Sequence, residues 1–189
     1  AWVPGQVPFE APAGSALRIE AGSQIVMQVH YNTAYLDPAE GVPSDRSEVL
    51  FWTLPTGEAP DQILRILPYA HIGIDIEAGD PADVEQRDFT IPFSATLVGV
   101  APHMHVLGTS IRSEILADEG EPACVVDIPD WDFNWQSRYH LRRPLRIPGG
   151  SRLIHEAWYD NSSANPFNPH VPPRRVTWGE GTDQEMGLL

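Results

Sequence analysis

Short apolar stretches, many of them alternating with polar residues, run along the chain and are separated by turns rich in proline and glycine. The clearest are SQIVMQVHYN (23–32), SEVLFWTL (47–54), ATLVGVAPHMHVLG (95–108), ACVVDIP (123–129) and SRLIHEAWYD (151–160). A period of two places successive side chains on opposite faces of an extended strand. The pattern therefore predicts an all-β protein, built as a β-sandwich or a barrel.

Helical patterning is weak, because prolines (19) and glycines (15) interrupt every window in which a 3.6-residue apolar period could develop. Only DPADVEQRD (80–88) could form a turn or two of helix. In LRRPLRIPGGSRLIHEAWYD (141–160), two strands flank a Pro-Gly-Gly turn in which glycine can supply a positive φ, and this predicts a β-hairpin. The polar segment 36–47 predicts a long loop or linker, with a domain boundary near it.

The charge balance narrows the partners. The chain carries 26 acidic and 12 basic residues, a formal net charge of -14. Nucleic acids and anionic membranes would repel such a surface, so a neutral or cationic small molecule is the expected ligand. No run approaches the ~18 apolar residues of a membrane span, so we expect a soluble protein whose signal peptide, if it has one, lies outside this sequence. Cys124 is the single cysteine, which excludes an intrachain disulfide.

Two histidines lie one residue apart in PHMHV (102–106). On a strand, residues i and i+2 project from the same face, so the rings of His103 and His105 should lie together while Met104 points the other way. The flanking run is apolar, and an unpaired polar ring is costly at the end of a buried strand. Two neutral imidazoles on one face are half of a metal site; the alternative is a pair of histidines at the edge of the core.

A third ligand would have to come from elsewhere in the chain. His30 ends a strand on its more polar face and is either a ligand or a hydrogen-bonded edge residue, and spacing alone favours the latter. Met186 follows an acidic turn and is either a core residue or a thioether ligand, which beside two imidazoles would select Cu(I). Four other histidines have no partner at ligand spacing and are expected to be surface or hydrogen-bonded residues: His71, His140, His155 and His170.

The segment WDFNWQ (131–136) places aromatic residues at alternate positions. On a strand, Trp131, Phe133 and Trp135 would share one face. We expect this face to belong to the core rather than to form a platform for a substrate.

Five motifs together resemble a known family. MQVHYN (27–32), PHMHVLG (102–108), WDFNWQ (131–136), YDNSSANPFNP (159–169) and WGEGTDQEM (178–186) are similar, in this order, to segments of the copper type II, ascorbate-dependent monooxygenases. This is the family of dopamine β-monooxygenase and peptidylglycine α-hydroxylating monooxygenase, and the resemblance is closer to its bacterial relatives. The joint occurrence of H-x-H-x-L-G with a late E-M is more specific than either motif alone.

The resemblance implies an antiparallel, jelly-roll-like β-sandwich with a copper site. His103, His105 and Met186 match the ligands of the copper at which O2 is activated and a substrate C–H bond is hydroxylated. His30 matches the third histidine of a second copper, which supplies an electron. The remaining ligands of that second copper, an adjacent His-His pair, have no counterpart, because this chain contains no two consecutive histidines.

By the same resemblance, residues 1–46 are the tail of the first copper domain with its linker, and 47–189 are the second domain. The implied protein is a secreted or periplasmic monooxygenase that uses O2, a small-molecule substrate, and ascorbate as electron donor. Because the N-terminal copper domain is missing, we expect this chain to bind one copper and to turn over poorly on its own.

The chain also departs from the family. Its animal members carry disulfides in the second domain, whereas Cys124 is alone, and the cysteine that commonly follows the methionine ligand is replaced by Gly187. Two alternatives stay open at this point. One is a non-catalytic β-sandwich that stores or delivers copper or binds a partner; the other is a copper-free sandwich that binds carbohydrate through exposed tryptophans.

Overall fold

The computed structural model describes residues 6–29, 31, 36–37, 41, 44–118 and 120–189. The chain forms two compact units, which divide between Ile66 and Leu67. Val7–Ile66 is one unit, and Leu67–Leu189 makes up nearly all of the other. This division falls later in the chain than the boundary predicted near residue 46. The assignment of residues 1–46 to a first copper domain stays a prediction.

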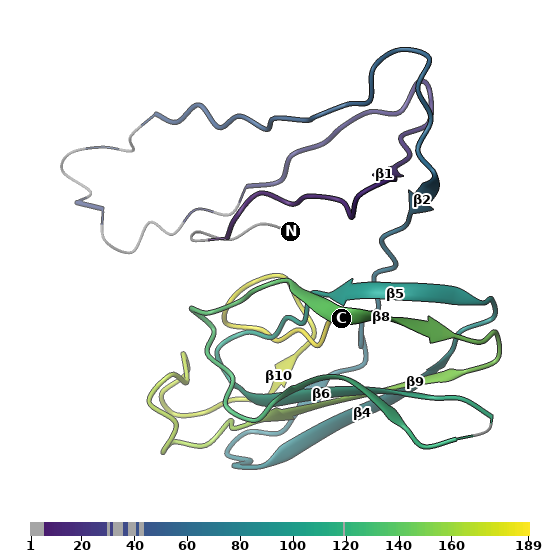
Figure 1. The fold of residues 1–189 in the computed structure, drawn as a ribbon. Helices are drawn as coiled ribbons and strands as arrows, with labels where there is room; N and C mark the ends of the chain where they lie inside the picture. Colours follow the sequence, from purple (N-terminus) through teal and green to yellow (C-terminus); the bar gives the residue numbers. More distant parts are fainter. Residues whose placement is uncertain (1–5, 30, 32–35, 38–40, 42–43, 119) are drawn as a thin grey trace. The chain divides into compact units, whose positions relative to one another are not determined.

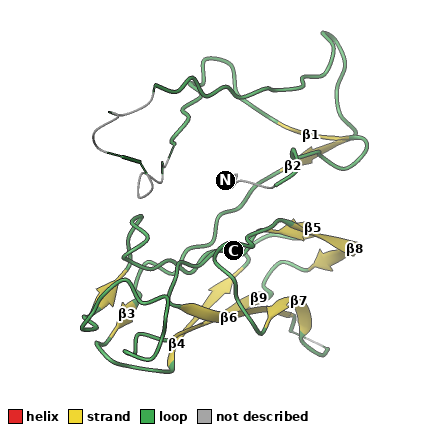
Figure 2. Cartoon of the chain, turned by 90° about the vertical axis from the view of Figure 1, so that its left-hand side faces the viewer, coloured by secondary structure: helices red, strands yellow, loops and turns green. Residues whose placement is uncertain are grey.

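The all-β prediction is confirmed, since the described residues contain strands and no helix (Figure 2). No described segment is therefore a helix long and apolar enough to cross a membrane. The jelly-roll detail stays a prediction. The strands are β1 Ser15–Leu17, β2 Gln62–Leu64, β3 Asp75–Ile76, β4 Asp83–Thr90, β5 Ala95–Val100, β6 Gly108–Leu116, β7 Ala123–Ile128, β8 Tyr139–Ile147, β9 Arg152–Tyr159 and β10 Val176–Thr177.

Two antiparallel sheets form a sandwich-like body in the Leu67–Leu189 unit (Figure 1). The larger sheet has the strand order β4-β9-β6-β7, and the smaller one pairs β5 with β8. Side chains from both sheets pack between them, because buried Ile115, Val125 and Leu153 of the large sheet form one cluster with Ile147 of β8. A short β3–β10 pair adds a third, small antiparallel sheet.

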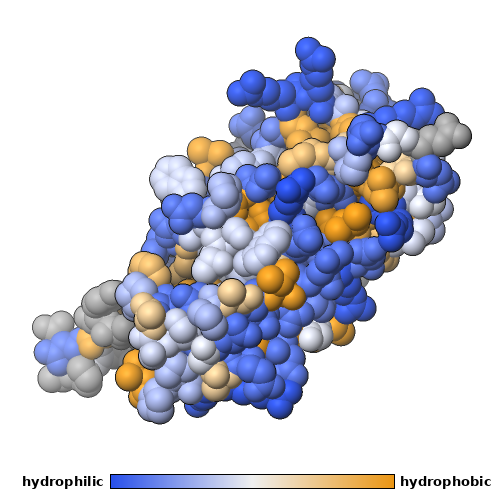
Figure 3. Space-filling model, turned by 90° about the horizontal axis from the view of Figure 1, so that it is seen from below, coloured by the Kyte–Doolittle hydropathy of each residue, from blue (hydrophilic) through white to orange (hydrophobic). Residues whose placement is uncertain are grey.

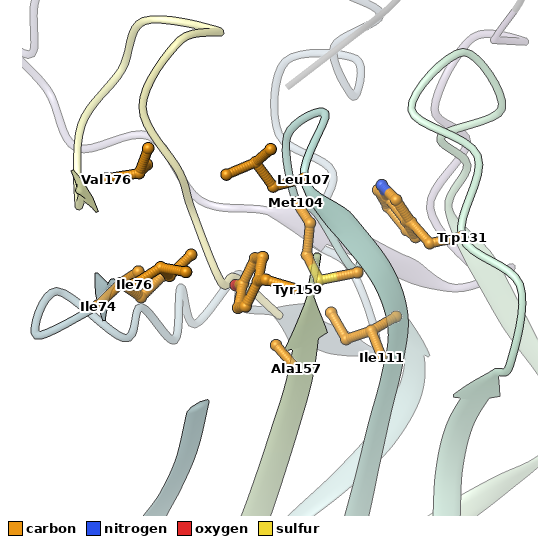
Figure 4. Close-up of a cluster of buried hydrophobic side chains, with 9 residues drawn as sticks. All are labelled: Ile74, Ile76, Met104, Leu107, Ile111, Trp131, Ala157, Tyr159 and Val176. Carbon is orange, nitrogen blue, oxygen red and sulfur yellow. The ribbon is translucent and has the colours of Figure 1, made fainter. Parts of the chain in front are cut away.

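A second buried cluster lies at the end of the sandwich where β5 connects to β6. Met104 is fully buried in it, and Figure 4 shows its side chain among Ile111, Tyr159 and Trp131. We call this group the Met104 cluster; its buried members are Ile74, Ile76, Met104, Leu107, Ile111, Trp131, Ala157, Tyr159 and Val176.

Two local predictions in this unit are wrong. The segment 80–88 is not helical, because Asp83–Thr90 forms β4 and pairs along its whole length with β9. The segment 141–160 is not a hairpin, because β8 and β9 belong to different sheets. The turn between them does use glycine as expected, since Gly150 has a φ of 94°. The sequence of a tight turn is therefore similar whether the two strands that it connects pair with each other or belong to different sheets.

The Val7–Ile66 unit has little regular structure. Its strands are β1 and β2, which pair in parallel over three residues. In the described parts of 23–32 and in 47–54 the predicted strands are absent, and apolar side chains there face outward, with Val26 84% and Trp52 78% exposed. These predictions are wrong for the described residues, because an apolar strand needs both a hydrogen-bonded neighbour and a covered face.

On the face of the molecule shown in Figure 3, hydrophobic residues form small groups. Figure 3 shows them separated by hydrophilic side chains on the face in view, in keeping with the 26 acidic residues of the chain.

Candidate metal centre

His103 and His105 lie in the connection between β5 and β6, as the sequence predicted for the end of an apolar strand. Their ring centroids are 5.0 Å apart, with the planes at 85°. Met104, between them, is buried in its own cluster (Figure 4). The expectation that the two imidazoles lie together and Met104 points away is confirmed, because this short segment keeps the period of two.

The C-terminal segment runs antiparallel beside these histidines. The N–H of His103 donates to the carbonyl of Leu188 at 3.1 Å, and the N–H of Leu188 donates back to His103 at 3.0 Å. Beside His105 the same segment contributes the backbone carbonyl of Gln184 and the carboxylate of Glu185, and Met186 follows directly in the chain. The tertiary structure thus brings together the backbone segments that carry His103, His105 and Met186, although they are about eighty residues apart in the chain.

Both rings are held through Nδ1 by a carbonyl oxygen. The Nδ1 of His105 lies 2.9 Å from the backbone carbonyl of Gln184, and the Nδ1 of His103 contacts the side-chain oxygen of Gln136. The Gln136 amide nitrogen donates to the carbonyl of Phe133 at 2.8 Å, which turns the amide oxygen toward His103. A carbonyl oxygen only accepts, so each Nδ1 carries a proton, and in a neutral ring the lone pair is then on Nε2.

The electrostatic environment keeps His103 neutral. Burial lowers the pKa of His103, and the proximity of His105 lowers it further, while the hydrogen bond to Gln136 acts in the opposite direction. A neutral ring is the form that binds a metal. Within the part of the chain that the structure describes, no group of three or more His, Cys, Asp or Glu side chains is arranged to hold a metal ion.

Glu185 is the most deeply buried acidic residue beside the histidines. It is fully inaccessible to solvent, and burial raises its pKa to about 7 in spite of hydrogen bonds from the backbone N–H groups of Leu107, His105 and Met186, which lower it. Sequence reasoning did not single out Glu185, Gln136 or Gln184. In the sequence, these three residues are visible only as polar positions within the motifs WDFNWQ and WGEGTDQEM.

The aromatic segment 131–136 lies beside the two histidines. Trp131 is buried in the Met104 cluster, as predicted, and the Phe133 ring meets the edge of His105 with centroids 6.2 Å apart. Trp135 is 75% exposed, so its assignment to the core is wrong. The reason is that the segment is a turn, closed by the Trp135 N–H donating to the carbonyl of Asp132 at 2.9 Å, and a turn does not keep the alternation of a strand.

Close packing explains why position 187 is a glycine. A Cβ at this position would lie 3.1 Å from the hydroxyl oxygen of Tyr159, which itself donates to the carbonyl of Met186 at 2.9 Å. A larger residue here would press on the hydrogen bond that holds the Met186 backbone.

The other predicted histidines fall into three groups. His30 lies outside the described residues, so its role as a ligand of an electron-transfer copper stays a prediction. His140 is exposed, and the Nε2 of His170 lies 3.0 Å from the carbonyl of Asp183, as expected for surface and hydrogen-bonded residues. His71 and His155 are both buried. The Nδ1 of His155 lies 2.8 Å from the hydroxyl of Ser113, as expected for a hydrogen-bonded residue, whereas the Nδ1 of His71 has no hydrogen-bond partner among the described residues, so the expectation for His71 is wrong.

Comparison with protein-family models and with curated proteins gives no match for this chain.

Proposed function

We propose that this chain contains the catalytic copper-binding domain of a copper-dependent monooxygenase, with His103, His105 and Met186 as the ligands. The observation that carries the proposal is the pair of Nδ1 contacts to carbonyl oxygens. Histidines that bind metals commonly donate their second ring N–H in this way, which fixes the tautomer and the ring orientation.

The choice of metal follows from the donors. Two imidazoles and a thioether form a soft set that favours copper in its reduced state over zinc, magnesium or calcium. When bound, copper supplies the activation of O2 for hydroxylation of a C–H bond, with ascorbate as the electron donor. The protein supplies two imidazole rings in fixed orientation, a thioether on the neighbouring segment and the Phe133 ring beside His105.

The resemblance to the ascorbate-dependent monooxygenases extends the proposal to the rest of the system. By this resemblance we expect a jelly-roll topology, a small-molecule substrate, a secreted or periplasmic location and an N-terminal copper domain as partner. Of that domain's copper ligands, His30 is the only one with a counterpart in this chain. We therefore expect one copper per chain and no more than poor hydroxylation with ascorbate and O2.

The test is X-ray absorption of the anaerobically reduced protein loaded with copper. The expected result is one Cu(I) per chain with a sulfur scatterer that disappears in Met186→Leu and remains in the matched control Met27→Leu, whose side chain is partly exposed in the other unit. Absence of stoichiometric copper, or a wild-type site with nitrogen and oxygen scatterers alone, would refute the ligand assignment.

A further inference from the structure

One carboxylate connects the backbones that carry the proposed ligands. The Oε2 atom of Glu185 accepts a hydrogen bond from the N–H of His105 at 2.8 Å and another from the N–H of Met186 at 3.2 Å. Its Oε1 atom accepts from the N–H of Leu107 at 2.7 Å. A single oxygen atom thus lies between the main chains of an imidazole ligand and the thioether ligand.

Burying the carboxyl group of Glu185 costs free energy unless its oxygens find hydrogen-bond donors. A carboxylate withdrawn from water loses a large solvation energy, and hydrogen bonds to its charged form offset part of the loss. Glu185 is fully inaccessible to solvent and accepts three such bonds from backbone groups. An apolar residue of similar size would leave the N–H groups of the 105–107 turn without this acceptor.

The side chain also begins from a fixed point. The N–H of Glu185 donates to the carbonyl of Thr177 at 3.2 Å, and its carbonyl accepts from the N–H of Gly179 at 3.1 Å. Thr177 belongs to β10, so the backbone of Glu185 is tied to the β3–β10 sheet. A ligand geometry is reproducible when the residues that support it are themselves held on regular structure.

We infer that Glu185 is the positioning residue of the copper centre, setting the separation between the Met186 thioether and the imidazole of His105 through the oxygen that both backbones share. The inference rests on the proposed copper site, since it assigns Glu185 a role toward those ligands. This role acts through the main chain, because both oxygens of Glu185 accept from main-chain N–H groups.

The experiment compares Glu185→Gln and Glu185→Asp with wild type. The first keeps the size and removes one acceptor oxygen; the second keeps the carboxyl group and withdraws it by one methylene. Glu85→Gln is the control, because Glu85, although only partly buried, is likewise a carboxylate that accepts a backbone N–H, from Asp75 at 2.8 Å. Circular dichroism in the near ultraviolet checks that each variant keeps its tertiary packing.

Two readouts separate the positioning role from the copper site. Hydrogen exchange of the copper-free protein measures the exchange rates of the amides of His105, Leu107 and Met186. These rates should be at least about tenfold higher than in wild type in both Glu185 variants and the same as in wild type in the control. Cu(I) affinity by chelator competition should fall about 10- to 100-fold in the Glu185 variants, with loss of the sulfur scatterer and retention of nitrogen scatterers.

Unchanged exchange at these amides would overturn the inference, whatever copper does. Faster exchange together with wild-type affinity and an intact Cu–S signal would also overturn it, because Glu185 would then stabilise the fold without setting the ligand geometry. If wild type binds no copper through sulfur, the proposed function fails. Faster exchange would then still support Glu185 as the residue that joins the two segments.

Discussion

At the residue scale, acceptors of hydrogen bonds decide what the two histidines can do. Gln136 has its own amide oriented by the carbonyl of Phe133, and this leaves its oxygen as the partner of His103. The carbonyl of Gln184 does the same for His105. Since either nitrogen of a neutral imidazole can carry the proton, these contacts place a proton on Nδ1 of each ring and fix the orientation of both rings.

His155 shows the opposite situation, a buried histidine with a structural role. Its ring is fully inaccessible, packs edge-on against Tyr69 at 5.4 Å and has an Nε2 atom with no hydrogen-bond partner among the described residues. Burial lowers the pKa of His155 from 6.5 to about 4, with a smaller contribution from His71. The folded protein therefore holds this ring neutral where the unfolded chain would protonate it.

This difference predicts an acid-sensitive stability. Because the unfolded state binds the proton of His155 more tightly, unfolding becomes easier as the pH falls from 6.5 towards 4 and levels off below that window. Between pH 7 and about pH 4.5 the expected loss from His155 is roughly 2 kcal/mol of unfolding free energy. Urea unfolding at both pH values should show a smaller pH dependence, by about that amount, in His155→Gln. An equal dependence in both proteins would contradict the prediction.

At the scale of elements, the connection from β5 to β6 is held from both sides. Its histidines pair with the C-terminal segment, while Met104 fills the core beneath them. Gly108, the first residue of β6, closes the turn through its N–H to the carbonyl of His105 at 3.3 Å. The motif H-x-H-x-L-G therefore places a residue without a side chain where the strand packs against Met104.

Replacing Gly108 with alanine should disturb this packing. The added Cβ would lie 2.9 Å from both Cβ and Cε of Met104, which is too close unless Met104 moves. We expect a loss of about 1 to 3 kcal/mol of unfolding free energy, as for other overpacked cores. Chemical unfolding measures it, with Gly73→Ala as the control, because a Cβ there makes only an ordinary contact of 3.5 Å with His71. A stability equal to wild type would show that Met104 is not confined.

At the scale of the whole molecule, the two units differ in how well they bury their apolar residues. Both buried clusters, eight of the ten strands and the residues of the candidate metal centre lie within Leu67–Leu189. Val7–Ile66 instead exposes large apolar side chains along most of its length, including Val7, Ile25, Leu50 and Trp52. A domain needs its own hydrophobic core to fold alone, and among the described residues only the Leu67–Leu189 unit has one.

A chain of residues 67–189 should therefore fold by itself. We expect a single cooperative unfolding transition, copper binding equal to that of the full chain, and weaker fluorescence of a dye that binds exposed apolar surface. Calorimetry, copper titration and dye fluorescence measure these properties. Failure of the shorter chain to unfold cooperatively would show that Val7–Ile66 contributes to the stability of the sandwich.

Local periodicity predicted the fold class and part of the site. The all-β character, the burial of alternate residues on β9 and the shared side of His103 and His105 follow from the geometry of an extended backbone, which neighbouring residues determine among themselves. The apolar runs 23–32 and 47–54 have the same pattern, yet their described residues form no strand. A strand also depends on a partner, which its own sequence does not specify.

Tertiary structure alone decided how these elements come together. It placed β8 and β9 in different sheets, turned Trp135 outward and set the segment of Met186 beside the histidines. It also selected Glu185 as the acceptor for backbone groups about eighty residues away. Such contacts depend on how buried surfaces fit and on which polar groups must find a partner inside them, and these are properties of the packed molecule rather than of any short stretch of its chain.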